Sequence, residues 1–155
     1  MHRKVLGLLA ALALIGGGVV SLHAGTATAD TTLNLRLKES FCGAERSYCK
    51  RLDHNPAGTF GDSVVFSLPL EYRSDGRRAG RDEGECVALA KDSDRAYCTF
   101  VAHLRNGTVA VQGSVALSNT EESVLPITGG TGAYEGASGY WKQVGQKVVL
   151  HTESP

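Results

Sequence analysis

The sequence predicts an all-β protein, namely an eight-stranded antiparallel β-barrel with no substantial helix in the mature domain. Apolar and polar residues alternate along several short segments, which is the period of half-buried strands. Turn residues separate these segments, and no helical apolar period persists for three turns. Closure into a barrel would remove the exposed edges that an open sheet must protect. A two-sheet sandwich is the alternative arrangement of the same strands.

The first 29 residues have the three parts of a secretory signal peptide. Basic residues at positions 2–4 precede the apolar run Val5–Val20, and the small residues Ala27–Ala29 end the segment. Three glycines interrupt the run, which is shorter than the roughly 20 apolar residues of a spanning helix, although an uncleaved N-terminal anchor is the alternative. We therefore expect a leader at 1–29 and one secreted domain at 30–155, with no membrane segment after cleavage.

Eight segments of the mature chain fit strands. They are Thr31–Glu39, Asp62–Tyr72, Glu85–Lys91, Arg95–Arg105, Thr108–Ser118, Ser123–Thr128, Tyr134–Val144 and Lys147–Thr152. In the first, Leu33, Leu35 and Leu37 share one face. Pro69 predicts an edge or a bulge in the second, because proline lacks a backbone donor. The dipeptide Asn106–Gly107 is the clearest hairpin signal, since a type I′ turn needs positive φ at both central residues.

A glycine-rich stretch, Leu125–Gly139, predicts a sharp reversal followed by a curved, closing sheet. Its first glycines lie in Gly129–Gly132, where we expect the chain to turn directly after Thr128. Gly136 and Gly139 fall in the next strand pattern, where glycine marks a bulge or a close backbone approach. No helical period and no P-loop lysine follow, so the stretch does not predict a phosphate loop.

Charge and composition argue against a nucleic-acid partner. Without the leader, the chain has 14 basic and 16 acidic residues, a formal charge of −2. The basic residues are scattered apart from Arg77, Arg78 and Arg81, and nearby acidic residues dilute that cluster. A surface that follows phosphates would need a denser basic stripe.

Four cysteines lie in the mature part, and an even count in an exported chain predicts two disulfides. Three pairings are open to Cys42, Cys49, Cys86 and Cys98. We favour Cys42–Cys49, which brackets a polar loop, and Cys86–Cys98, which brackets a turn between two strand patterns. No metal site is predicted, because the cysteines lack zinc-ligand spacing and the histidines are far apart in sequence.

Several motifs in conserved order carry a family resemblance. They are Gly61–Phe66 (G-D-S-V-V-F), Asp75–Gly80 (D-G-R-R-A-G), Gly84–Cys86 (G-E-C), Asn106–Gly113 (N-G-T-V-A-V-Q-G) and Ile127–Gly139 (I-T-G-G-T-G-A-Y-E-G-A-S-G). Between Gly61 and Trp141 the chain resembles the allene oxide cyclase and dirigent superfamily, and most closely its small secreted bacterial members. The resemblance implies an eight-stranded barrel with an apolar cavity and no redox cofactor. It also implies a homo-oligomer, a dimer or trimer, since the plant members are often trimers.

The resemblance also suggests candidate catalytic residues. Glu39 and Cys86 match by position the glutamate and cysteine beside the substrate of allene oxide cyclases, but a disulfide would remove Cys86 from any thiol role. Dirigent proteins use carboxylates and polar groups in the cavity, which makes Asp62 and Tyr72 candidates. Each has a structural alternative: Glu39 as a solvated strand end, Asp62 as a turn cap and Tyr72 as a core aromatic residue.

Two functions follow. In the first, a secreted barrel binds a small apolar reactive molecule and directs the stereochemistry of its cyclisation or coupling without a cofactor, as a cyclase or isomerase would. In the second, the barrel is a non-catalytic module that binds a small molecule or acts at the cell surface. A buried cavity carboxylate with a raised pKa would favour catalysis, whereas carboxylates that all face solvent would favour the binding module.

Overall fold

The chain folds into antiparallel strands that close into a barrel. The computed structural model describes residues 30–38, 49–51, 60–89 and 94–153. The strands are β1 (Thr31–Leu37), β2 (Cys49–Arg51), β3 (Ser63–Tyr72), β4 (Arg78–Ala88), β5 (Arg95–Leu104), β6 (Gly107–Ala116), β7 (Glu122–Gly132), β8 (Ser138–Val144) and β9 (Lys147–Glu153). In these ranges no helix is long and apolar enough to cross a membrane.

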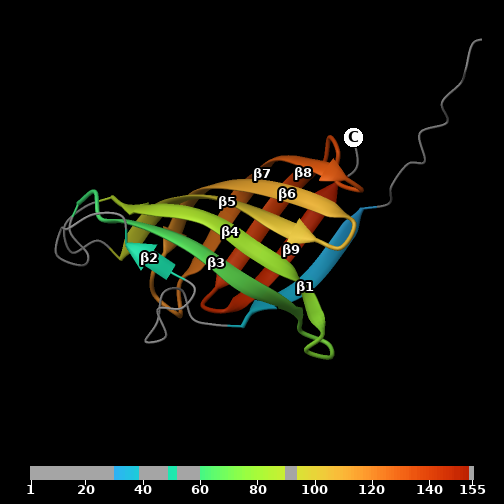
Figure 1. Ribbon diagram of the computed structural model, residues 1–155, viewed down its shortest axis with the longest axis horizontal. Coiled ribbons are helices and arrows are strands. Elements are labelled where there is room, and N and C mark those ends of the chain that lie inside the picture. Colours follow the sequence, from blue (N-terminus) through green and yellow to red (C-terminus); the bar gives the residue numbers. More distant parts are fainter. Residues whose placement is uncertain (1–29, 39–48, 52–59, 90–93, 154–155) are drawn as a thin grey trace, which may run out of the picture.

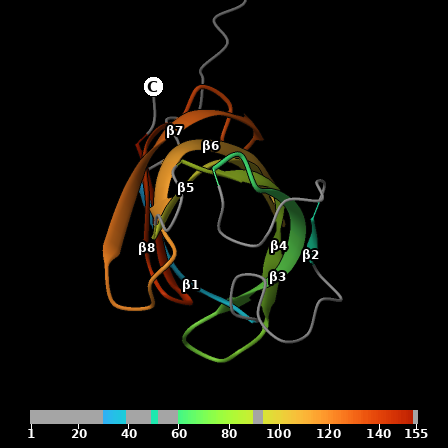
Figure 2. The same ribbon diagram turned by 90° about the vertical axis from the view of Figure 1, so that its left-hand side faces the viewer.

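The barrel is closed by β1, which pairs with β9 on one side and with β3 on the other. Each of the strands from β3 to β9 is antiparallel to the next one along the chain. Viewed along the barrel, the strands form a ring (Figure 2). The short β2 pairs only with the start of β3, outside this ring (Figure 1). The predicted eight-stranded barrel is therefore confirmed, with β2 as an addition.

Alternation along the strands fills the interior with apolar side chains. Leu35 and Leu37 of β1 are buried, as are Phe66, Leu68 and Leu70 of β3. The other strands supply the rest of the core: Ala79, Cys86, Ala96, Cys98, Phe100, Ala102, Val109, Val111, Val115, Leu125, Ile127, Trp141, Val148 and Leu150. Burial of this apolar surface, at roughly 25 cal/mol per Å², is the main stabilising contribution to the barrel.

Several strand boundaries differ from the sequence prediction, and β8, for example, starts at Ser138 rather than at Tyr134. Strand β4 starts at Arg78 rather than Glu85, so its ladder with β3 includes the charged stretch before Cys86. Strand β7 continues through the glycines to Gly132, and the reversal occurs at residues 133–136 instead of directly after Thr128. Glycines can remain in a ladder when a neighbouring backbone lies close. A Cβ on Gly130 would lie 2.3 Å from the Tyr134 carbonyl oxygen.

The predicted bulge is present, and the predicted hairpin forms with its turn one residue earlier than Asn106–Gly107. In the hairpin the paired residues are Leu104 and Gly107, so Arg105 and Asn106 form the turn and Gly107 already belongs to β6. The register of β3 with β4 shifts between Leu70 and Glu71, next to Pro69. The Pro69 carbonyl accepts a hydrogen bond from the Lys38 amide, so the side of Pro69 that lacks a donor faces the end of β1.

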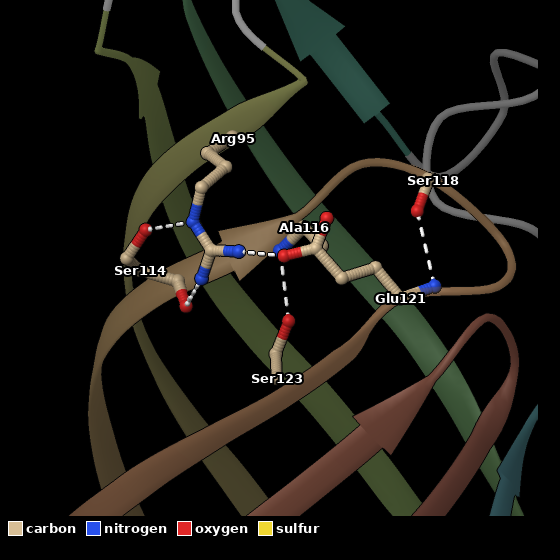
Figure 3. Close-up of polar contacts among 6 residues, drawn as sticks. All are labelled: Arg95, Ser114, Ala116, Ser118, Glu121 and Ser123. Carbon is tan, nitrogen blue, oxygen red and sulfur yellow. Dashed lines mark hydrogen bonds and ion pairs between the residues drawn. The ribbon is translucent and has the colours of Figure 1, made fainter.

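Side chains hold β6 and β7 together where their backbone pairing stops. The ladder runs from Gly107 only to Val111, opposite Ile127. Beyond it, the Ala116 amide donates to the buried Ser123 hydroxyl at 2.8 Å, and Arg95 contacts both Ser114 and Glu121 (Figure 3). The ion pair fixes the β6–β7 connection to β5.

One of the two predicted disulfides lies in the described residues. Cys86 of β4 and Cys98 of β5 are direct register partners, their Cα atoms are 4.1 Å apart, and they form a disulfide inside the barrel. This pairing is confirmed. The predicted Cys42–Cys49 disulfide and the leader at 1–29 lie outside the residues that the structure describes.

Candidate functional site

A carboxyl group lies in the interior of the barrel. Asp82 is in the middle of β4, between Leu68 of β3 and Ala102 of β5, and only 3% of it is exposed. Among the described residues, Oδ1 of Asp82 has no hydrogen-bond partner. A buried, unpaired carboxyl oxygen is costly, which is why such groups often mark functional sites.

The bulge in the β3–β4 ladder turns Asp82 inward. Ala79 and Asp82 are both buried, although side chains three residues apart on a regular strand point to opposite faces. Gly80 pairs with Leu70 and Arg78 pairs with Glu71, so Ala79 is the extra residue. From Gly80 onward the inward positions are Asp82, Cys86 and Ala88, with Gly84 between them.

Glycines on both sides of Asp82 allow β5 to lie unusually close to β4. A Cβ on Gly80 would lie 2.0 Å from the His103 carbonyl oxygen, and a Cβ on Gly84 would lie 2.3 Å from that of Thr99. Only glycine fits at such distances. Asp82 therefore has no side chain beside it at either neighbouring inward position of β4.

Aromatic rings bound the site on one side. Phe66 and Phe100 are the register partners of Gly84, with ring centroids 6.2 Å apart. Phe100 also packs edge-on against Trp141, the single tryptophan of the chain, at 5.1 Å. These contacts form a rigid apolar layer next to Asp82.

Two tyrosines lie toward the opposite end of the barrel. Tyr72 ends β3, and Tyr134 is in the β7–β8 turn, so both are at the end that also holds the β5–β6 turn. Both are partly buried and pack against the core. Burial and, to a smaller extent, the nearby Tyr72 raise the pKa of Tyr134, so its hydroxyl keeps its proton at neutral pH.

Burial also decides the charge state of Asp82. Loss of hydration raises the pKa of this carboxyl well above its usual range, and the adjacent negative charge of Glu83 adds to the effect. A protonated carboxyl can donate a hydrogen bond or a proton, which an ionised one cannot. The site thus combines a carboxyl group of raised pKa with apolar and aromatic walls.

The predicted site residues do not lie together. Asp62 precedes β3 and is half-buried, and its backbone carbonyl accepts from the Ala88 amide at 2.8 Å. Tyr72 is at the other end of the same strand, about 30 Å away at roughly 3.3 Å per residue. Glu39 lies outside the described residues. Of the three predicted site residues, Tyr72 packs against the interior core. Asp82 faces the same interior from its position on β4.

Sequence reasoning missed Asp82 because it started the strand at Glu85. Asp82, Gly84 and Cys86 share one strand face, so an alternation extended backward from the predicted strand would have placed Asp82 on the same face as Cys86.

Two other kinds of chemistry, thiol catalysis and metal binding, depend on the side chains that the strands place at the site. Cys86 is in a disulfide with Cys98, so it has no thiol for catalysis. Within the described ranges, no group of three or more His, Cys, Asp or Glu side chains could hold a metal ion.

Several solved structures have this fold. A pyocyanin demethylase is 23% identical over 80% of this chain and 99% of its own, with a TM-score of 0.59. A pterocarpan synthase dirigent protein is 16% identical over 80% of this chain and 84% of its own, with a TM-score of 0.62. The Diels–Alderase AbmU from Streptomyces koyangensis is 14% identical over 85% of this chain and 72% of its own, with a TM-score of 0.56. At these identities the likeness concerns the fold.

Comparison of the sequence with curated proteins returns no match. The model of the allene oxide cyclase barrel-like domain, in contrast, matches residues 47–151, from β2 to β9. This range includes every barrel strand except β1, and it includes Asp82 with its flanking glycines. The chain therefore belongs to the allene oxide cyclase barrel-like family.

Proposed function

We propose that the barrel binds a small, mainly apolar reactive molecule and directs its cyclisation or coupling without a cofactor. The observation that carries this proposal is the buried carboxyl of Asp82, whose Oδ1 has no hydrogen-bond partner in the described part of the chain, between aromatic and aliphatic side chains. The proposal extends to an exported protein, because the expected leader would deliver this barrel outside the cell.

In the proposed mechanism, Asp82 acts as the acid. Its protonated carboxyl donates a hydrogen bond to a substrate oxygen, such as a carbonyl, and stabilises the negative charge that develops there as a ring or a new bond forms. Such a bond is worth more in an apolar interior than in water, because no solvent competes for it. The substrate class is therefore an apolar molecule with a carbonyl or quinone oxygen.

The walls determine which product forms. Phe66, Phe100 and Trp141 hold the reactant in one orientation, which lowers the entropic cost of reaching the transition state. Tyr72 and Tyr134 supply hydroxyl donors at the end of the barrel and could bind a second substrate oxygen. Tyr72 remains a candidate site residue in this proposal, and Asp62, at the other end of β3, has no part in it.

Two proteins of similar fold carry names that agree with cyclisation or coupling: a pterocarpan synthase of the dirigent type and a Diels–Alderase. A third, the demethylase, is named for a different reaction. The alternative function, a non-catalytic binding module, would not require an acid inside the barrel. The burial of Asp82 favours catalysis by the criterion derived from the sequence.

The test uses Trp141 as an intrinsic probe. Native mass spectrometry of the purified protein first identifies any small molecule that co-purifies. A series of apolar ketones and quinones, beginning with 1,4-naphthoquinone, is then titrated against Trp141 fluorescence, and the carbonyl stretch of the bound compound is recorded by infrared spectroscopy. We expect a carbonyl stretch at lower frequency in the wild type than in Asp82→Leu, because the hydrogen bond is lost.

Asp62→Asn is the matched control, because it changes a carboxyl group at the distant end of β3. Asp62→Asn should bind the compound with the wild-type affinity, and the carbonyl stretching frequency of the bound compound should be the same as in the wild type. Equal affinity and equal frequency in Asp82→Leu would contradict the proposal, as would the failure of every compound in the series to bind.

A further inference from the structure

A separate hollow lies on the outer wall of the barrel, at the β3–β4 bulge. Its volume is about 230 Å³, and it is lined by Lys38, Pro69, Leu70, Glu71, Arg78 and Arg81. This is below the roughly 300–1,000 Å³ of sites that take drug-sized ligands, so it fits a small group. Three of the six lining residues are basic and one is acidic.

The single carboxylate of the hollow is already neutralised. Arg36 binds Glu71 at 2.7 Å, between Nη2 and Oε2, and the Lys38 ammonium lies 3.8 Å from the other carboxylate oxygen. Glu71 is only 15% exposed, so Arg36 holds it firmly. Two cations, Arg36 and Lys38, therefore share the one negative charge of Glu71, which leaves excess positive charge in this group.

The two arginines differ in their contacts. Arg81 donates to the Ser67 hydroxyl at 2.9 Å and lies 3.7 Å from Glu83, so its charge is balanced. Arg78 is exposed and forms no ion pair with any residue that the structure describes. It is the register partner of Glu71, which places it directly beside the Arg36–Glu71 pair. Arg78, together with the two cations that share Glu71, therefore gives the hollow an excess of positive charge.

We propose that this hollow is an oxyanion-binding site that takes a phosphate group, with Lys38 and Arg78 as its main ligands. Guanidinium and ammonium groups that converge on one hollow match the oxygens and charge of a phosphate. Pro69 and Leu70 are the apolar residues of its lining. The site is on the outer wall, so the inference is independent of the function proposed for the interior.

The test is calorimetric titration of the folded protein with inorganic phosphate at low ionic strength. We expect one site per chain, and an affinity that is at least about tenfold weaker in the double variant Lys38→Gln/Arg78→Gln, at roughly fivefold for each lost charge. The affinity should also fall as salt is added. Arg77→Gln is the matched control, since Arg77 is equally basic and adjacent but paired with Asp75 at 2.6 Å. It should change the affinity less than about twofold.

A second arm distinguishes free phosphate from a lipid headgroup. In this arm the wild type should co-sediment with phosphatidylglycerol vesicles but not with phosphatidylcholine vesicles, and the double variant should co-sediment with neither. That result would identify the phosphate as a lipid headgroup. Binding of inorganic phosphate alone would identify a soluble ligand. The proposal is wrong if neither probe binds, if the double variant binds as tightly as the wild type, or if Arg77→Gln weakens binding equally.

Discussion

Asp82 shows how one residue can be unfavourable for stability and useful for chemistry. In the described part of the chain, it is the only buried ionisable side chain, and its pKa is raised mainly by burial. Below its usual pKa of 3.8 both the folded and the unfolded chain hold the proton. At higher pH the unfolded chain releases it while the folded chain keeps it, so stability is lost as pH rises.

This gives a first prediction for Asp82→Asn, which cannot ionise. The stability of the variant relative to the wild type should increase from pH 4 to pH 7, by up to about 1.4 kcal/mol per pH unit until the folded pKa is passed. Urea unfolding of both proteins at several pH values measures this difference in stability. The contributions of the other carboxyl groups are shared by both proteins and cancel. A difference that does not change with pH would show that Asp82 is ionised in the folded state.

The glycines beside Asp82 give a second prediction. Gly84→Ala should destabilise the barrel by about 2–3 kcal/mol, because the new Cβ would lie 2.3 Å from the Thr99 carbonyl oxygen and 2.5 Å from the Phe100 Cβ. Gly129→Ala is the control, since its Cβ would meet no atom within 4 Å, and it should not destabilise the protein. Thermal unfolding compares the two variants, and equal losses would contradict the close approach of β4 and β5.

At the scale of elements, Ser123 replaces a missing ladder bond between β6 and β7. Ser123→Ala would leave the buried Ala116 amide without its acceptor, which should cost about 1–3 kcal/mol. Ser118→Ala removes a hydroxyl that accepts from the exposed Glu121 amide, and it should cost less than about 1 kcal/mol. Hydrogen exchange of the Ala116 amide checks the mechanism, because protection there should fall only in Ser123→Ala.

Much of this fold could be predicted because residues of the outer and inner strand faces alternate along the sequence. The leucines of β1 were placed correctly on one face, and so was the Cys86–Cys98 pair. The phase of β4 was not predictable in the same way. A bulge changes the alternation by one residue, and nothing local in the sequence marks Ala79 as the extra residue.

The candidate site was less predictable than the fold for a related reason. Proximity in a barrel depends on register across strands that are far apart in sequence, and a one-residue shift moves a side chain to the other face. Asp62 and Tyr72 were chosen from the family resemblance, although the predicted strand already placed them at its two ends, where the structure also has them. An alternation extended backward from Cys86 would have given the strand face of Asp82, whereas its place between β3 and β5 needed the structure.

For the whole molecule, the Cys86–Cys98 disulfide joins two strands within the barrel wall. Cys86→Ala/Cys98→Ala should lower the free energy of unfolding by about 3 kcal/mol, since the disulfide closes a short loop with a sequence separation of 12 residues. Urea unfolding of the double variant measures this without reducing the other cysteines. An unchanged midpoint would mean that the β4–β5 ladder alone restrains these strands.

The pairing of β1 with β9 has a further consequence for chain connectivity. Thr31 and Thr152 are register partners, so the first and last strands of the barrel begin and end side by side. A linker of a few residues could join them, and new termini could be opened in the exposed turn at Arg105 and Asn106. Such a circular permutant should keep the same barrel and the same inward Asp82, because each strand would keep its two neighbours.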